Sequence, residues 1–298
     1  MQISTNVFYD MAARRMTSLT GKANTLQVEL STGKKLQSPS DDAAASAQIA
    51  EFDRRDANDA VYKTNLTLAR SLLQQSDTAL GQLGNQVQKA LELATQAANG
   101  TLNAANRASI GDQIASIRDA MMGLANSKDA RGQPLFGATA QNAVQVDGNG
   151  NYSYSSANSS EIPIADGQSV SVSVGADQVF KAGGSDTFTV LNNLVTALKS
   201  GTGSTLTSTI QDAMTKLSAS NDNIASVQAS VGARQARVEL QQGLQQQAST
   251  DRATLRSSLE DADATTTITQ LQQTMTVLQA TQASFTKLSS LSLFDYLK

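Results

Sequence analysis

The chain has 298 residues, of which 16% are charged and 4% aromatic; it contains no Cys, His or Trp and has a formal net charge of -3. The absence of Cys and His excludes disulfides, thiol nucleophiles, ordinary zinc sites and the commonest general base. The acidic balance argues against a nucleic-acid binder, because no basic surplus is available to neutralise phosphates. We therefore expect no enzyme and no catalytic, cofactor-binding or metal-binding residues.

The start of the chain, MQISTNVFYDMAARRM, lacks the basic stretch and following apolar stretch of a cleaved secretory signal. The sequence also lacks the run of about 18 apolar residues that a transmembrane helix needs. These two features alone favour a cytoplasmic protein, while an export route that needs no cleaved signal stays open.

Residues 5–32 are predicted to form a helix that ends at Gly33, a residue type favoured just after a helix C-terminus. Its apolar residues repeat at the steps of three and four that are typical of a coiled coil: Met16, Leu19, Ala23, Leu26 and Leu30. Two interpretations stay open. One is an ordinary amphipathic core helix, and the other is a seam that pairs with the far end of the chain.

Residues 33–40 predict a turn before the next helix. Ser38 can cap that helix, Pro39 suits its first position, and Asp41 can accept a hydrogen bond at the third. Paired Asp41 and Asp42 also raise the alternative of a metal or acid/base site. No further ligand clusters near them, so we favour two anions at a helix N-terminus.

A long helix is predicted from about residue 43 to residue 99. It holds a heptad of apolar residues: Tyr62, Leu66, Ala69, Leu73, Leu80, Leu83, Val87, Ala90, Ala94 and Ala97. Ser76 interrupts the apolar set, while Gly81 and Gly84 indicate close contact with another helix. A charged cluster precedes the heptad and is interpreted as a solvated or inter-subunit face: Glu51, Asp53, Arg54, Arg55 and Asp56.

Asn99-Gly100 predicts a stop, with Thr101 as the cap of a third helix. The apolar seam of this helix consists of Ile110, Ile114, Ile117, Met121 and Leu124. The short turn between the two helices predicts an antiparallel pair.

Turn signals recur after Arg131 and predict a small β-rich insertion, about residues 133–184. Val144 and Val146 alternate with polar residues before Asp147-Gly148, and Tyr152 and Tyr154 alternate after it. This pattern predicts a hairpin. A further strand is predicted from three alternating valines, Val170, Val172 and Val174.

Helical pattern returns at residues 188–199 and at about residues 205–259. The longer segment carries an apolar seam of Ile210, Met214, Leu217, Ile224, Val231 and Val238. Asn221, Gln228 and Gln235 occupy intervening seam positions, where polar residues lower stability but specify register.

The C-terminal segment has no charged residue between Ala264 and Thr286. Its apolar residues also take coiled-coil steps: Ile268, Leu271, Met275, Leu278 and Phe285. Threonines are poor helix formers and a lone helix is marginal in water, so this segment needs a partner. We predict an assembly seam built from both ends of the chain: Met16, Leu19, Leu26, Leu30, Ile268, Leu271, Met275, Leu278 and Phe285.

These elements predict a mainly α fold, a long antiparallel helical rod with coiled-coil termini and a small β-rich central insertion. Three domains are expected. Residues 1–40 with 261–298 form a terminal coiled coil, residues 41–132 with 186–260 form the long-helix rod, and residues 133–185 form an outer β-rich domain.

Three segments resemble the bacterial flagellin family: ISTNVFYD (3–10), LSTGKKLQSPSDDAAASAQIA (30–50) and LQATQASFTKLSSLSLFDYL (278–297). ATQAANGTLNAANRASI (94–110) and RGQPLFG (131–137) are similar to its helix turn and its entry to the outer domain. Phe8-Tyr9-Asp10 and the ending LSLFDYL (291–297) are most similar to the members that join the flagellar hook to the filament. Ala43 departs from the pattern, because many relatives carry Pro there.

This resemblance implies a structural subunit of the bacterial flagellum, an adaptor whose termini self-assemble into the inner layer of a helical ring or tube. It implies a neighbouring hook-associated subunit and flagellin as partners, with no nucleic acid and no membrane insertion. It also implies an extracellular location reached through the flagellar type III export route, with an export chaperone that holds the C-terminal segment beforehand.

Two alternatives stay open. The first is a flagellin that forms the filament itself. The second is a flagellin-like surface adhesin that binds glycans through Tyr152 and Tyr154 of the β-rich insertion.

Overall fold

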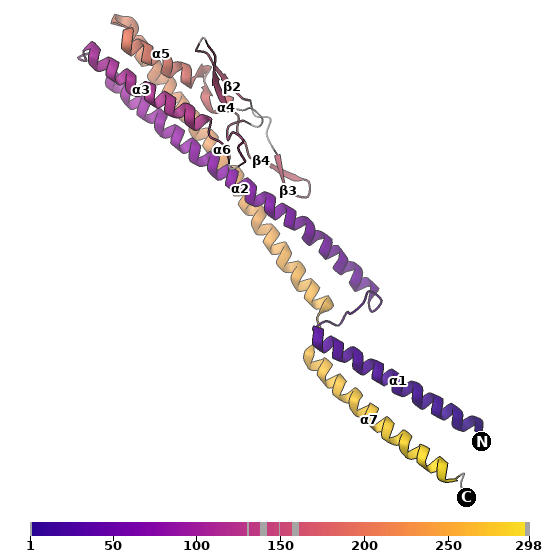
Figure 1. Ribbon diagram of the computed structural model, residues 1–298. Helices are drawn as coiled ribbons and strands as arrows, with labels where there is room; N and C mark the ends of the chain where they lie inside the picture. Colours follow the sequence, from indigo (N-terminus) through magenta and orange to yellow (C-terminus); the bar gives the residue numbers. More distant parts are fainter. Residues whose placement is uncertain (1, 130, 138–141, 149, 157–160, 296–298) are drawn as a thin grey trace. The chain divides into compact units, whose positions relative to one another are not determined.

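The computed structural model describes residues 2–129, 131–137, 142–148, 150–156 and 161–295. Within this part of the chain helices dominate (Figure 1): α1 (Gln2–Thr32), α2 (Ala43–Ala97), α3 (Ala104–Ala125), α4 (Ala176–Phe180), α5 (Thr187–Ser200), α6 (Gly203–Glu260) and α7 (Ala264–Asp295). The mainly α class is confirmed. None of these helices carries an apolar window long enough to cross a membrane.

The chain divides into two compact units, and α2 and α6 contribute residues to both. The terminal unit comprises residues 1–57 and 247–298, and the central unit comprises residues 58–246. The three-domain division expected from the sequence stays a prediction, in which the β-rich insertion would be a domain of its own.

The core of the central unit is the predicted heptad of α2. Leu66, Leu73, Leu80 and Leu83 are fully buried in one cluster with residues from α3, α5, α6 and the β-rich region. The α6 seam faces the same cluster, with Leu217, Ile224, Val231 and Val238 each almost entirely buried. Each such side chain contributes about 1.5–3 kcal/mol. The long helices of the central unit are therefore stable through packing inside one chain.

The helix starts differ from the sequence prediction. Ser38 does not cap α2. Asp42 does so instead, because its Oδ1 accepts hydrogen bonds from the N–H groups of Ala44 and Ala45 at 3.0 Å. Likewise Asn103, and not Thr101, caps α3 by accepting from Asn106 N at 2.8 Å. In both cases the polar residue directly before the first helical turn forms the cap, because its side chain reaches the unpaired N–H groups of that turn.

Three small antiparallel strand pairs make up the β structure of the described residues. They are β1 (Val144–Val146) with β2 (Tyr152–Tyr154), β3 (Glu161–Ala165) with β4 (Gln168–Ser171), and β5 (Lys181–Ala182) with β6 (Ser185–Asp186). The predicted hairpin is confirmed, although Asn149 in its turn lies outside the described residues. The predicted valine strand is only partly right, because β4 contains Val170 and ends before Val172.

Side-chain hydrogen bonds fix the β-rich region to the long helices of the central unit. Asn65 of α2 donates to Pro163 O at 2.8 Å, and Asn223 of α6 donates to Gln178 O at 2.7 Å. Arg234 of α6 donates to Ser173 O at 3.2 Å. These donors pair with carbonyl groups of β3, of α4 and of the segment that follows β4.

The tightest helix contact is between α3 and α5. A Cβ placed at Gly111 would lie 3.3 Å from Leu198 Cβ and 3.5 Å from Val195 O. Gly81 and Gly84, which the sequence marked for close contact, face α6 at ordinary distances of 3.7 and 3.8 Å. Gly111 is therefore a glycine inside a helix where the packing leaves little room for a side chain.

We predict that Gly111→Val lowers the free energy of unfolding by about 1–3 kcal/mol, because extra methyl groups overpack the α3–α5 contact. Gly123→Val is the matched control, since nothing lies within 4 Å of its Cβ position on the same helix. Urea unfolding followed by far-ultraviolet circular dichroism measures both variants. Equal stability of the two would contradict the close contact.

Candidate assembly surface

The two ends of the chain pair with each other in the terminal unit. α7 packs along α1, and the rings of Tyr9 and Phe285 meet edge to face with centroids 5.4 Å apart. At the opposite end of the pair Ala262 N donates to Gly33 O at 2.8 Å. The start of α1 thus lies beside the end of α7, so the two helices are antiparallel (Figure 1).

The buried side of α7 alternates threonines with apolar residues. It consists of Thr267, Leu271, Thr274, Leu278, Thr281 and Phe285, which step four, three, four, three and four. Thr274 donates its hydroxyl to Gln270 O and Thr281 donates to Val277 O, each at 2.7 Å. Because each of these two hydroxyls is satisfied within its own helix, the threonine turns a methyl group toward the seam. The sequence analysis missed these threonines, although Leu271, Leu278 and Phe285 already marked the heptad.

The predicted seam residues divide into three groups. Leu26 and Leu278 are buried. Met16, Leu19, Leu271 and Phe285 are half-buried on the facing sides of the two helices. Leu30, Ile268 and Met275 are exposed, at 38%, 41% and 43%. The structure thus brings six of the nine residues to the pair and leaves three on its outside, so their part in assembly stays a prediction.

The α1–α7 pair is a thin interface. Threonines and Ala23 fill seam positions that leucines fill in α2, and four of the six apolar seam residues stay partly exposed. Val277 and Val28 are further exposed apolar side chains on the two helices, at 38% and 43%. An interface of this kind contributes less burial per turn than a full coiled coil. The pair therefore leaves apolar surface that is not covered within the chain.

A short two-stranded contact ties α1 to the end of α6. Lys35 N donates to Glu260 O at 2.7 Å, and Lys34 Nζ lies 2.8 Å from Glu260 Oε2. Gly33 allows the chain to turn here with φ of 71°, in the left-handed region that glycine enters without strain. The tie sets where the antiparallel pair begins.

Asp263 directly precedes α7 and caps the first turn of this helix. Its carboxylate accepts from Thr266 Oγ1 at 2.7 Å and from Thr265 N at 3.0 Å. Hydrogen bonds from the Thr266 hydroxyl and from the N–H groups of Thr266 and Thr265 hold the pKa of Asp263 below its ordinary value. A lowered pKa means that the cap is complete at neutral pH and is lost only as the pH falls through that value.

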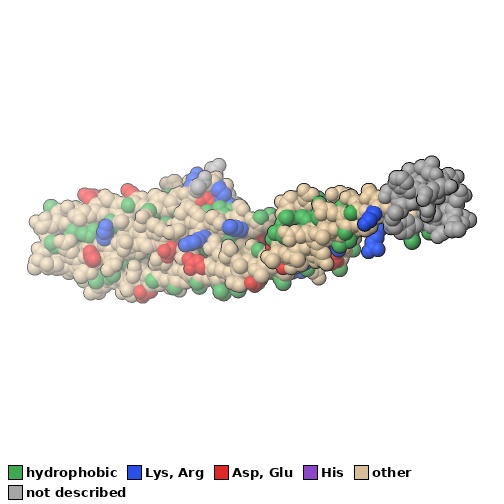
Figure 2. Space-filling view, turned by 90° about the horizontal axis from the view of Figure 1, so that it is seen from below, with side chains coloured by type: hydrophobic (Ala, Val, Ile, Leu, Met, Phe, Trp, Pro, Cys, Tyr) green, Lys and Arg blue, Asp and Glu red, His purple; other side chains and the backbone are tan. Residues whose placement is uncertain are grey.

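The charged cluster of α2 pairs with α6 inside the terminal unit. Arg252 Nε lies 2.9 Å from Asp56 Oδ1, and Arg256 pairs with both Asp53 and Asp56. Figure 2 shows one face of the molecule, where acidic and basic side chains are few and scattered. Charge is therefore used here to pair α2 with α6, and much of the remaining surface is uncharged.

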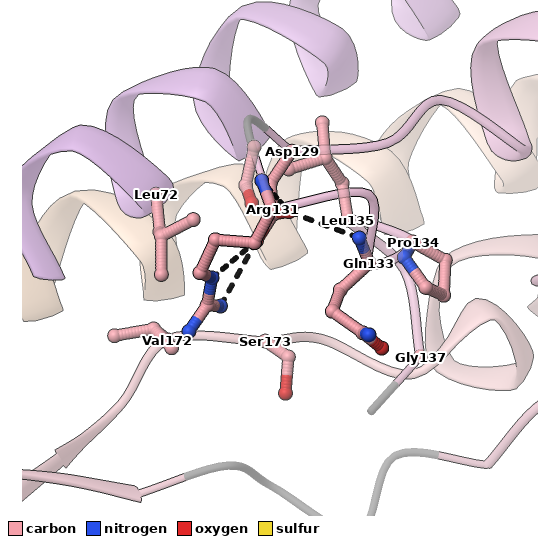
Figure 3. Close-up of a pocket in the computed structure, with 10 residues that line it drawn as sticks. Leu72, Asp129, Arg131, Gln133, Pro134, Leu135, Gly137, Val172 and Ser173 are labelled. Carbon is pink, nitrogen blue, oxygen red and sulfur yellow. Dashed lines mark hydrogen bonds and ion pairs between the residues drawn. The ribbon is translucent and has the colours of Figure 1, made fainter. Parts of the chain in front are cut away.

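A cavity of about 230 Å³ lies in the central unit where the chain leaves α3 for the β-rich region (Figure 3). Asp129 is the acid in its wall, and its carboxylate accepts from Arg131 N at 2.8 Å, Gln133 N at 3.0 Å and Arg131 Nε at 2.9 Å. Burial acts to raise the pKa of Asp129, but these hydrogen bonds outweigh it and lower the pKa. All of its donors come from the same loop, so Asp129 fixes the loop and leaves no free acid or base in the cavity.

The tyrosines of the β1–β2 hairpin pack inward. The Tyr152 ring stacks on Phe188 with centroids 5.3 Å apart, and Tyr154 stacks on Phe180 at 6.1 Å. The Tyr154 hydroxyl donates to Asp186, and burial together with this bond raises the pKa of Tyr154 far above its usual range. Both tyrosine rings thus take part in packing within the chain, and the Tyr154 hydroxyl is also bonded there.

Acids do not cluster elsewhere in the described part of the chain. No group of three or more His, Cys, Asp or Glu side chains lies close enough there to hold a metal ion. The paired Asp41 and Asp42 take separate backbone roles: Asp41 accepts from the N–H groups of Gln37 and Ser38 at 2.9 and 2.8 Å, and Asp42 caps α2. We therefore take the surface of the α1–α7 pair as the candidate site among the described residues.

Comparison with known proteins agrees with this view. The model of the bacterial flagellin N-terminal helical region matches residues 3–141. The flagellar hook-associated protein 3 of Escherichia coli (strain K12) is 26% identical to this chain over the full length of both. Residues 3–141 thus resemble the flagellin N-terminal region, and the whole chain is similar to a flagellar hook-associated protein.

Other flagellin-family members match less of the chain. Polar flagellin F of Vibrio parahaemolyticus is 27% identical over 48% of this chain and 38% of its own length. The fold is shared with the flagellar junction protein of Legionella pneumophila, with a TM-score of 0.60 at 15% identity, covering 73% of this chain and 100% of that one. Sequence similarity thus extends through the whole chain for the hook-associated protein and through about half of it for flagellin F.

We predict that Gly33→Val loosens the tie at the base of the α1–α7 pair. A β-branched residue in the left-handed region costs about 1–2 kcal/mol or more, so α1 and α7 should exchange their amide hydrogens faster. Gly21→Val is the control, because Gly21 lies within α1 with open space around it. Hydrogen exchange read by mass spectrometry tests this, and equal exchange in the two variants would argue against the tie.

Proposed function

We propose that this chain is a structural subunit of the bacterial flagellum, an adaptor that joins the hook to the filament through coiled-coil assembly of its termini. The observation that carries the proposal is the full-length similarity to a hook-associated protein, together with a terminal helix pair that leaves apolar residues uncovered. The predicted assembly seam, including the exposed Leu30, Ile268 and Met275, is assigned to contacts between subunits.

The mechanism is coupled folding and assembly. Ordering α1 and α7 costs backbone entropy of roughly 1–2 kcal/mol per residue, which a seam of threonines and partly exposed side chains offsets poorly within one chain. Neighbouring subunits add burial, about 1.5–3 kcal/mol for each Leu, Met or Phe that becomes covered. The terminal helices would therefore gain their stability mainly from the assembled ring or tube.

The partners and the export route follow from the family and are part of the proposal. The neighbours would be another hook-associated subunit on the hook side and flagellin on the filament side. The chain would leave the cell through the flagellar type III route without a cleaved signal peptide. An export chaperone would hold the uncharged segment 264–286 before assembly.

Two other functions have less support. A filament-forming flagellin is disfavoured because the similarity to flagellin F covers 48% of the chain, whereas the similarity to the hook-associated relative covers all of it. A glycan-binding adhesin is disfavoured because Tyr152 and Tyr154 are stacked on Phe188 and Phe180. A structural role without catalysis is the function that this site supports.

We predict that the source bacterium, when it lacks this chain, builds hooks but sheds unpolymerised flagellin into the medium. The reason is that a hook without its adaptor offers no surface on which flagellin polymerises. Electron microscopy of cells and an immunoblot of the medium measure this. Filaments of normal length on the deletion strain would refute the junction role, and growth of long filaments from the purified chain alone would favour a flagellin.

We predict that deletion of residues 278–298 abolishes incorporation into flagella while the central unit stays folded. The deletion removes Leu278 and Phe285, two of the larger seam residues, but none of the central unit. Circular dichroism checks the fold, and an immunoblot of isolated flagella measures incorporation.

A double variant at exposed positions of the same helix, Gln273→Ala with Thr276→Ala, serves as the control for this deletion. It should incorporate as the unchanged chain does. Normal incorporation of the truncated chain would show that the C-terminal helix is not needed.

A further inference from the structure

A second apolar surface lies in the terminal unit, outside the α1–α7 pair. It is a groove of about 540 Å³ between the first turns of α2 and the last turns of α6. Its lining consists of Ala47, Gln48, Glu51, Phe52, Arg55, Leu255, Ser258 and Leu259. Leu255 is 53% exposed, and it lies near the end of α6, where Leu240 and Leu244 are also exposed, at 65% and 56%.

The charges at the rim of this groove are already paired. Glu51 Oε1 lies 2.9 Å from Arg55 Nε, and the other oxygen of Glu51 pairs with Arg54. The Arg55 hydrogen bond holds the pKa of Glu51 below its ordinary value. A charged occupant would have to be desolvated against an apolar floor with no free counter-ion of its own. The groove therefore suits a neutral segment that carries apolar side chains.

The uncharged segment of α7 has the chemistry that fits. Ile268 and Met275 are 41% and 43% exposed, stand seven residues apart, and so lie on one face of the helix beside the α1 seam. Gln272 and Gln279 flank this face, with amide groups that can bond to the polar rim without carrying charge. No residue from Ala264 to Thr286 is charged.

The groove and the face of α7 that carries Ile268 and Met275, here called the stripe, are both exposed in one chain. The chain's own α7 therefore does not fill its own groove. We propose that the groove between α2 and α6 receives the Ile268–Met275 stripe of α7 from a second copy of this chain. The inference rests on the proposed function, because it names the contact through which the assembled subunits follow one another. Other flagellar proteins as occupants are outcomes of the test.

The geometry of such a contact matches the proposed assembly. Groove and stripe are different surfaces, so the contact is heterologous: each copy gives its α7 to one neighbour and receives an α7 from another. Heterologous contacts close into rings or continue as helices, whereas a self-complementary contact stops at a dimer. A junction between two tubular segments needs a heterologous contact.

The absence of cysteine from the chain permits a direct test. Two differently tagged chains, one with Leu255→Cys and one with Met275→Cys, are expressed together in the strain that lacks the native chain. Isolated flagella are treated with a short bis-maleimide. The expected result is a cross-linked product of two chains that carries both tags.

The matched control pairs Leu255→Cys with Gln273→Cys, which is exposed on the other side of α7 from Met275. Its yield of two-tag product should be several times lower. Equal yields from the two pairs, or a product that joins Leu255→Cys to a different flagellar protein, would overturn the inference.

A second pair of variants guards against loss of folding. Leu255→Arg places a charge in the groove, while Leu240→Arg places one on α6 at a residue that is 65% exposed and lies outside it. Both should keep the helix signal of the unchanged chain, and only Leu255→Arg should lose incorporation. Equal incorporation of the two would also overturn the inference.

The failures of the two proposals can be told apart. If the unchanged tagged chain is absent from isolated flagella, the proposed function is wrong. If the chain is present and motility is restored, but Leu255 and Met275 yield no specific product, then only the docking of α7 in the groove is wrong.

Discussion

The terminal unit depends on one weak interaction, the antiparallel pairing of α1 with α7. Its α7 side alternates threonine with leucine or phenylalanine, and among the larger seam side chains with described burial only Leu26 and Leu278 are buried. The antiparallel ends are fixed by the Tyr9–Phe285 ring contact and by the backbone bonds of the Gly33–Ala262 tie. A seam of this strength sets register and direction, while leaving most of the available burial energy for contacts with other chains.

The central unit differs from the terminal unit because its apolar seam is buried. There α2 and α6 use Leu66, Leu73, Ile224 and Val231 in a seam that is almost fully covered, and α3, α5 and the β-rich region complete the core. The tight approach at Gly111 and the amide bonds of Asn65 and Asn223 leave little surface that needs a neighbour. The central unit thus buries its apolar residues within the chain, whereas the terminal unit leaves several of them exposed.

Periodicity predicted the helices, the central heptad and the β1–β2 hairpin, because burial on one face imposes a regular spacing of apolar residues. It assigned Ile268 and Met275 to the α7 seam, whereas Thr267 and Thr274 take the buried positions beside α1. The difference arises because hydropathy counts a threonine as polar, while the Thr274 hydroxyl is bonded to its own helix and leaves only a methyl group to pack. The caps Asp42 and Asn103 could have been found from their place directly before the helices, whereas the burial of Tyr154 against Phe180 depends on tertiary contacts that no local pattern carries.

The threonine seam also explains why the segment carries no charge. A helix with leucine at every seam position would pair strongly and early, and it would aggregate if it were exposed before assembly. Threonine lowers both helix propensity and burial, and glutamine keeps the outer faces polar without charges that would have to be desolvated in a packed tube. The threonines and glutamines that make the α1–α7 pair thin would therefore leave its second face, with Ile268 and Met275, free to pack against another subunit in the proposed assembly. In the proposed assembly, this exposed face is the surface that a neighbouring subunit would cover.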